Sequence, residues 1–207
     1  MKRLALFACA AGAMLFAPAH ATIVGGDITG GTSTGSFVEL TVPFTESNPD
    51  NTVGNNTFQD PNLYAFNEGT FVVAADLALD FGGLIAGETV QSHYVFFDPA
   101  GTTSVEGYVD FAGDIIAVAV NLAALTASDI YGAPSVMYLS PALRGLEPGD
   151  TVALDGLKRL LIDWTASTPG DFIRVFTKVN DVPLPAAAWV FLAGLGGIAA
   201  RLRRKKA

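Results

Sequence analysis

Cysteine is almost absent from this chain of 207 residues, because the only one, Cys9, lies in an apolar run near the N-terminus. Disulfide-stapled folds, cysteine nucleophiles and thiolate metal sites are therefore excluded for the rest of the chain. Histidine is nearly as scarce, with only His20 and His93. A metal site built from several histidines is excluded as well, because His93 alone lies beyond the first twenty residues.

Basic residues are scarce between the two ends of the chain. Residues 22–181 contain all 20 acidic residues but only five Lys and Arg residues, a net charge of −15, whereas the whole chain carries −8. The other seven basic residues lie at the extreme ends. Nucleic-acid binding needs clustered Lys and Arg to contact phosphates, so no nucleic acid is expected as a partner.

The longest uncharged apolar runs lie at the two ends of the chain. At the N-terminus a short basic segment precedes Leu4–Phe16, and Ala19 and Ala21 supply the small residues that signal peptidase reads at positions −3 and −1. Residues 1–21 are therefore predicted to be a signal peptide. An uncleaved anchor and a lipoprotein processed at Cys9 are weaker alternatives, because the run is short for a membrane span and cleavage at Cys9 would leave almost no apolar core.

The C-terminal apolar run covers residues 186–200, which is fifteen residues and about 22 Å of helix, against about 30 Å for a bilayer core. Flanking residues extend it to a predicted transmembrane helix at about 186–202, with Trp189 at the interface. A basic cluster follows, which by the positive-inside rule places the C-terminus in the cytoplasm and residues 22–181 outside it. The cluster consists of Arg201, Arg203, Arg204, Lys205 and Lys206. The simplest interpretation is a permanent single-pass anchor in the inner membrane.

The residues before this helix favour a more specific interpretation. Val182, Pro183, Leu184, Pro185 and Ala186 form a short extended motif, followed by a marginal helix and a terminal basic cluster. This tripartite tail, residues 182–207, resembles the VPLPA-CTERM variant of the bacterial PEP-CTERM sorting signals. The resemblance implies recognition by a membrane-embedded exosortase, removal of the tail, and delivery to the cell surface or the extracellular space. Two prolines hold the motif in an extended form that a protease can read.

The acidic middle is expected to be one domain with an all-β fold, a single β-sandwich or jelly roll over residues 37–181, preceded by a flexible lead-in over 22–36 with at most one edge strand. Short runs of β-branched and aromatic residues alternate there with Gly, Pro, Asn and Asp. A short helix or two turns are expected within Leu122–Tyr131, ended by Gly132. Strands are predicted over residues 37–42, 71–81, 90–97, 105–111, 115–120, 151–154, 160–164 and 172–179.

Several patterns suggest catalysis only weakly. Gly31–Gly35 matches G-x-S-x-G around Ser33, but a nucleophile elbow needs a strand before it and a helix after it. Ile23–Gly26 matches the mature N-terminus of trypsin-like proteases, without the serine segment that such an enzyme needs. His93 is a candidate general base, although a lone strand histidine is more often a packing residue. Asp76 and Asp80 are one of many acidic pairs that a glycosidase could use.

Two binding sites are also considered. Metal candidates in and after a loop rich in Asn are Asp50, Asn51, Asp60 and Glu68, with Asn55, Asn56 and Asn62 nearby. Carboxylate and amide oxygens suit calcium, but an ordinary polar loop is the simpler interpretation because no EF-hand spacing is present. A sugar-stacking platform would need Tyr64, Phe66, Tyr108 and Trp164 exposed on one face, whereas aromatic residues in strands are mostly core.

These patterns predict a non-enzymatic exported protein of the cell envelope or extracellular matrix, held by and processed at its C-terminal tail. The alternative is a carbohydrate- or calcium-binding module associated with exopolysaccharide. A hydrolase is the third hypothesis, and it needs a cleft where His93 or two carboxylates converge.

Overall fold

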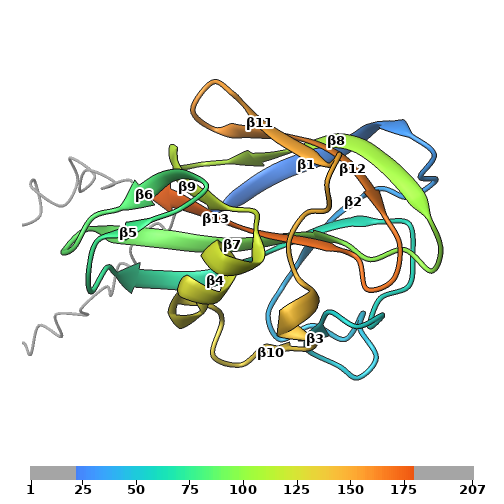
Figure 1. Cartoon of the computed structure of the whole chain (residues 1–207), viewed down its shortest axis with the longest axis horizontal. Helices are drawn as coiled ribbons and strands as arrows, with labels where there is room; N and C mark the ends of the chain where they lie inside the picture. The colour runs from blue at the N-terminus through green and yellow to red at the C-terminus, as the bar shows by residue number, and fades with distance from the viewer. Residues whose placement is uncertain (1–21, 180–207) are drawn as a thin grey trace, which may run out of the picture. The chain divides into compact units, whose positions relative to one another are not determined.

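A computed structural model describes residues 22–179 (Figure 1). The predicted signal peptide, sorting motif, transmembrane helix and basic cluster lie outside these residues. The elements are β1 (Ile23–Gly31), β2 (Phe37–Leu40), β3 (Thr52–Val53), β4 (Leu63–Val72), β5 (Leu77–Ala78), β6 (Phe81–Leu84), β7 (Thr89–Phe97), β8 (Thr103–Phe111), β9 (Ile115–Ala119), α1 (Leu122–Ala127), the 3-10 turns η1 (Asp129–Tyr131) and η2 (Pro141–Leu143), β10 (Met137–Tyr138), β11 (Thr151–Asp155), β12 (Arg159–Ala166) and β13 (Asp171–Lys178).

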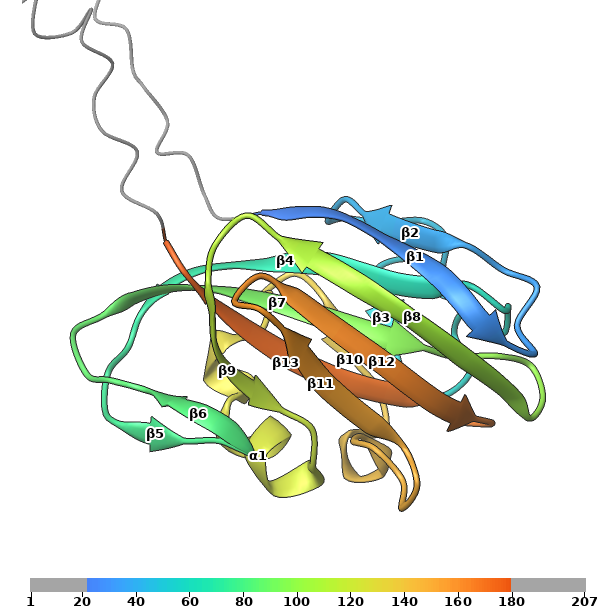
Figure 2. The same ribbon diagram turned by 90° about the horizontal axis from the view of Figure 1, so that it is seen from above.

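The domain is all-β and sandwich-like, as predicted. One sheet has four strands in the order β1-β8-β12-β11, and the other has seven in the order β2-β4-β7-β13-β9-β6-β5. Most neighbouring strands are antiparallel, while β2 pairs with β4 in parallel. A separate short parallel pair joins β10 to β3. Figure 2 shows the four-stranded sheet lying over the larger one.

Apolar side chains fill the space between the sheets. The four-stranded sheet contributes residues such as Val109, Leu160 and Trp164, and the seven-stranded sheet contributes others such as Val95 and Val175. A second apolar cluster lies on the opposite face of the seven-stranded sheet, where α1 and the loops around it cover an aromatic layer. That layer consists of Tyr64, Phe66, Tyr94, Phe96 and Phe172. The larger sheet is therefore covered on both faces.

This arrangement explains two different burial patterns. In β12 buried and exposed residues alternate, because only one face of the four-stranded sheet meets the core. In β7 and β13 almost every residue is buried, because both of their faces are covered. Sequences such as Tyr94–Phe97 and Phe172–Phe176 are accordingly continuous apolar runs, with Arg174 as the one charged exception.

The segment 22–36, expected to be a flexible lead-in with at most one edge strand, contributes the nine-residue edge strand β1. It pairs with β8 along most of its length. Gly26 makes this pairing possible, because a Cβ there would lie 2.6 Å from the ring of Phe37 and 2.7 Å from the carbonyl oxygen of Tyr108. The glycines of residues 22–36 were expected to make this segment flexible. In the fold they instead allow one backbone to approach another closely.

The strand predicted over residues 71–81 is wrong. The strand is instead β4, which ends at Val72, and the chain beyond it forms a loop containing the short β5 and β6. Val73 closes this loop by donating its N–H to Glu88 and accepting one from Gly87. The other seven predicted strands are confirmed with ends shifted by a few residues. The missed strand contains Asn67, Glu68 and Gly69, which interrupt its apolar pattern at a β-bulge.

The expected short helix is confirmed as α1 followed by η1, and Gly132 caps the second turn. Asn121 begins α1 by accepting the N–H of Ala124 on its side chain, which is ordinary N-capping. No helix within residues 22–179 has the length and apolar character to cross a membrane.

Candidate functional site

His93 is a buried packing residue. Its side chain lies between the sheets with no exposed surface and contacts the ring of Phe111, 4.8 Å between centroids. Its Nδ1–H donates to Asn67 Oδ1 at 2.7 Å, and the Thr177 hydroxyl donates to its Nε2 at 2.9 Å, an assignment that leaves the imidazole neutral. Burial lowers the pKa of His93 to about 3. A side chain without access to solvent cannot serve as a general base for an external substrate.

The other catalytic candidates form hydrogen bonds with backbone groups or belong to a strand. Ser33 donates its hydroxyl hydrogen to the carbonyl of Pro61 and accepts the N–H of Gly35, and no helix follows it. Ile23–Gly26 is part of β1. Asp76 accepts the N–H of Ala86. Asp80 accepts the N–H groups of the two residues that precede α1. Both carboxylates therefore accept hydrogen bonds from backbone N–H groups, and they do not converge on a cleft.

The predicted aromatic platform is not on the surface. Tyr64, Phe66 and Trp164 are buried, with exposed fractions of 3% or less. Tyr64 and Phe66 belong to the covered face of the seven-stranded sheet, whereas Trp164 lies in the core between the sheets. Only Tyr108 is partly exposed, and the Arg159 guanidinium stacks on it at 3.9 Å from the ring centroid. These four residues form no common face for a sugar.

The calcium candidates are dispersed. Asp50 is exposed, Asn51 holds the backbone of Phe44 and Ser135, and Asp60 accepts bonds from the backbone N–H of Asn62 and the Tyr64 hydroxyl. Glu68 is buried elsewhere in an ion pair. Within residues 22–179 no group of three or more His, Cys, Asp or Glu side chains is arranged to hold a metal. Asn51, Asn55 and Asn56 have φ values of 55°, 52° and 63°, which explains the Asn-rich loop by turn geometry.

A buried ion-pair network, which sequence reasoning missed, lies under α1. The Arg174 Nε donates to Glu68 Oε2 at 2.7 Å and its Nη2 to Oε1 at 3.0 Å, and neither side chain has exposed surface. Ser92 and Tyr138 donate their hydroxyls to the same carboxylate. Although burial lowers the pKa of Arg174, the Glu68 carboxylate outweighs this effect and raises it. Glu68 is the extra residue of the β4 bulge, which explains how it reaches this face.

The network extends from Glu68 to α1 and η1, and it attaches these elements to the seven-stranded sheet. The Nη1 of Arg174 donates to the Leu125 carbonyl, the Ser128 hydroxyl and Asp129 Oδ1, and so ties the end of α1 to β13. Arg144 forms a two-pronged pair with Asp129, 2.7 Å on each prong. Partial burial raises the pKa of Asp129, but the two guanidinium groups outweigh it, so that the pKa lies below its usual range. One basic residue within the apolar run of β13 was the available sequence signal for a buried ion pair.

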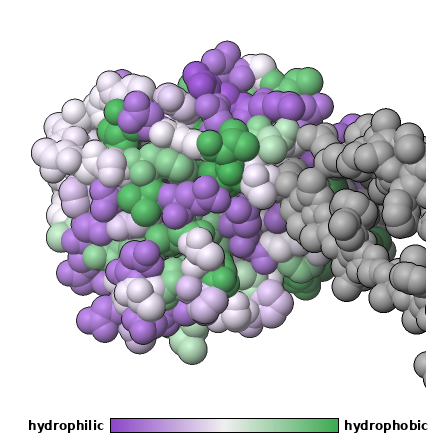
Figure 3. All heavy atoms as spheres, turned by 180° about the vertical axis from the view of Figure 1, so that it is seen from behind, coloured by the Kyte–Doolittle hydropathy of each residue, from purple (hydrophilic) through white to green (hydrophobic). Residues whose placement is uncertain are grey.

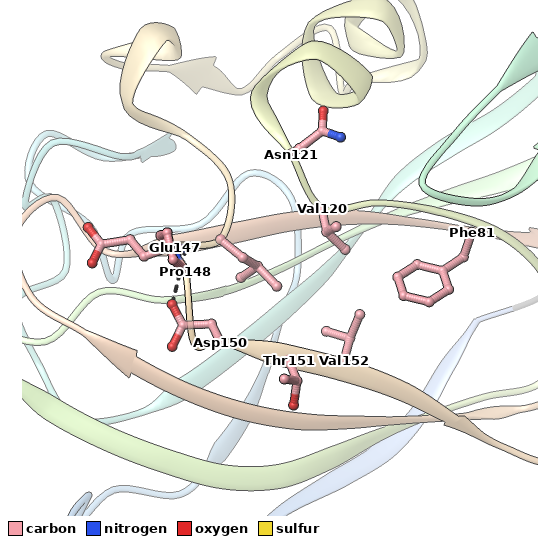
Figure 4. Close-up of a pocket in the computed structure, with 9 residues that line it drawn as sticks. Phe81, Val120, Asn121, Glu147, Pro148, Asp150, Thr151 and Val152 are labelled. Atoms are coloured by element: carbon pink, nitrogen blue, oxygen red, sulfur yellow. Dashed lines mark hydrogen bonds between the residues drawn. The ribbon is translucent and has the colours of Figure 1, made fainter.

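An open groove with a volume of about 430 Å³ lies beside the start of α1. Figure 4 shows Phe81, Val120 and Val152 turned toward a common space, with Glu147 and Asp150 at the other end. The segment after Arg144 forms one wall and is held by the N–H of Leu146 bonding to the Val120 carbonyl at 2.8 Å. The groove is therefore apolar at one end and acidic at the other.

Its acidic end is fixed by hydrogen bonds. Asp150 accepts the N–H of Thr165 at 2.7 Å. It also accepts the N–H of Glu147 at 3.1 Å, the bond drawn as a dashed line in Figure 4. Asp171, only 2% exposed, has an Oδ2 without a hydrogen-bond partner among the described residues. Burial, together with the charges of Asp150 and Glu147, raises the pKa of Asp171 to about 8. Glu147 and Asp150 thus place two carboxylates at this end of the groove.

The face seen in Figure 3 mixes hydrophilic and apolar side chains. Because the residues considered for catalysis and sugar stacking are buried or hydrogen-bonded within the fold, the groove is the candidate site that residues 22–179 offer instead. No protein-family model matches this chain, and no curated protein or solved structure is significantly similar to it.

Proposed function

We propose that this chain is a non-enzymatic exported protein of the cell envelope or extracellular matrix, whose acidic β domain is released from its membrane tail by exosortase-type processing at Val182–Ala186. The observation that best supports this proposal is that every described strand lies between the two predicted processing sites. Among residues 22–179, the first strand begins at Ile23, two residues after Ala21, and the last strand ends at Lys178, four residues before Val182. Processing at both sites leaves every strand intact.

Both ends of the fold are held at one place. The carbonyl of Thr22 accepts the N–H of Ala112, and the N–H of Lys178 donates to the carbonyl of Asp114, so the turn between β8 and β9 holds both termini. Figure 2 shows β1 beginning and β13 ending at the same end of the domain. This arrangement supports an exported domain that is presented from one end and released by one cut.

The charge and the side-chain assignments also support this proposal. Residues 22–181 carry a net charge of −15, which favours solubility outside the cell. The side chains considered for catalysis all form hydrogen bonds within the fold, and they are His93, Ser33, Asp76 and Asp80. The alternative, a module for exopolysaccharide or calcium, would have to use surfaces other than the aromatic and Asn-rich segments considered for it.

The test is the intact mass of the exported protein in cells with and without the exosortase. We expect a species that begins at Thr22 and lacks the basic cluster in the first strain, and a species that retains the tail in the second. Replacing Pro185 by Ala should cause the tail to be retained in the first strain, whereas Asn180→Ala, just outside the motif, should not. A mass that includes the basic cluster in both strains would refute the proposal.

A further inference from the structure

The two sheets end at different places on the side of the groove. The four-stranded sheet stops at β11, whose outer edge has no strand partner among residues 22–179. The seven-stranded sheet continues past β9 with β6 and β5. Phe81 of β6 and Val118 of β9 face Val152 and Leu154 of β11. The edge of β11 therefore runs above a shelf made by the larger sheet (Figures 1 and 2).

A free strand edge offers unpaired main-chain groups. In β11 the antiparallel ladder with β12 uses one side of the strand, from Thr151 to Asp155. Alternate N–H and C=O groups point away from that ladder and are open to an added strand. Five residues of strand correspond to about 17 Å, which is enough for a short extended peptide to pair along it.

The shelf below this edge and the side of β11 that faces it are both apolar. Phe81 is 41% exposed and Leu154 is 44% exposed, and Val152 lines the groove between them. In an added strand every second side chain would point toward this floor. Apolar side chains on that face would cover Phe81 and Leu154, which are otherwise in contact with water.

The charges near the groove distinguish two possible sources of the added strand, a second copy of this chain and a different protein. Glu147 and Asp150 line the groove at one end of β11, and no Lys or Arg lines it. At the other end Asp155 lies opposite Arg159, whose guanidinium pairs with Asp110. Antiparallel pairing of two β11 edges would bring Asp150 and Asp155 of both copies into one short ladder, where like charges repel. A strand with Lys or Arg near its ends would instead meet opposite charges.

We propose that the edge of β11 and the groove beside it bind an extended segment of a partner protein, added as a strand, with apolar side chains facing Phe81 and basic side chains meeting Glu147 and Asp155. The interaction goes beyond the export and processing proposed above, because it concerns what the released domain contacts.

The test uses the purified full chain in mild detergent and a labelled peptide, acetyl-KVTVTVK-amide, with acetyl-EVTVTVE-amide as its charge-reversed counterpart. Saturable binding of the basic peptide is expected by fluorescence anisotropy, with weaker binding of the acidic one. Hydrogen exchange should slow over residues 151–155 when the basic peptide binds, because main-chain N–H groups of β11 become bonded.

Matched variants localise the binding. Glu147→Lys should weaken binding of the basic peptide roughly tenfold, whereas Glu88→Lys, the same charge change at an exposed residue that does not line the groove, should change it less than about twofold. Phe81→Ala should weaken binding, while Val72→Ala, another exposed apolar residue, should not. Circular dichroism of each variant checks that the fold is retained.

Four results would overturn the proposal. The first is the absence of saturable binding. The second is equal weakening by Glu147→Lys and Glu88→Lys, which would show a general attraction to the acidic surface. The third is a self-associated chain that Phe81→Ala converts to monomer, which would identify a second copy as the occupant. Binding without slower exchange over residues 151–155 would also contradict strand addition.

Discussion

Replacing Arg174 by Met is predicted to destabilise the domain strongly. The substitution keeps an unbranched apolar stem but removes all five hydrogen bonds that the guanidinium donates, two of them to Glu68. The Glu68 carboxylate would then stay buried with only the hydroxyls of Ser92 and Tyr138 as donors. Removing one partner of a buried ion pair costs about 3–5 kcal/mol, against a total stability of about 5–15 kcal/mol for a domain.

A second variant separates lost charge from lost packing. Glu68→Leu combined with Arg174→Met removes both charges, and replacing a buried pair by apolar residues is often nearly neutral. We therefore expect the double variant to be more stable than Arg174→Met alone. The free energy of unfolding is measured by urea denaturation followed by circular dichroism, with equal slopes required for the comparison.

The matched control is the surface pair between Arg159 and Asp110. Their side chains are 38% and 28% exposed, and the Arg159 Nε lies 2.7 Å from Asp110 Oδ1. Because water solvates both partners, Arg159→Met should cost far less than Arg174→Met. Equal losses in the two variants would show that burial of the Arg174 network does not stabilise the fold.

The remaining predictions concern pH. His93 has a pKa of about 3 in the fold, below its ordinary 6.5, so at this site the unfolded chain binds more protons and the contribution of His93 to stability falls as pH drops below about 6.5. Relative to His93→Gln, the parent should therefore lose about 1.4 kcal/mol on going from pH 8 to pH 5.5, measured by urea titrations of both proteins at the two pH values. Asp171 has a pKa of about 8, above its ordinary 3.8, so its contribution is fully present below pH 3.8 and is lost as pH rises toward 8. Asp171→Asn should thus be more stable than the parent at pH 8, by up to about 5 kcal/mol, and nearly equal to it at pH 4; equal stability at pH 8 would contradict the burial argument.

The strands that the sequence predicted best are those with the simplest environment. β7 and β13 are apolar along their whole length because both faces of their sheet are covered, and such runs are visible without knowing the fold. β4 was missed although it lies between β2 and β7, because its bulge at Glu68 and the neighbouring Asn67 and Gly69 break the pattern. A bulge depends on the partner strand, which a local pattern does not contain.

The candidate sites show the same division. Scarcity of cysteine and histidine excludes whole classes of chemistry from composition alone. The aromatic residues Tyr64, Phe66 and Trp164 were named as a possible platform, but burial of each is decided by what packs on the opposite side. The groove beside β11 could not be anticipated, because it arises where two sheets of unequal width end.

The sequence by itself determined the acidic character of residues 22–181 and the all-β class, because these depend on composition and on contiguous patterns, and it predicts a signal peptide before the domain and a sorting tail after it. Only the tertiary structure decided that Arg174 neutralises Glu68 from 106 residues away, that His93 is buried, and that β11 leaves a free edge. These features depend on contacts between segments distant in the chain, and a one-residue bulge or one extra strand is enough to change them.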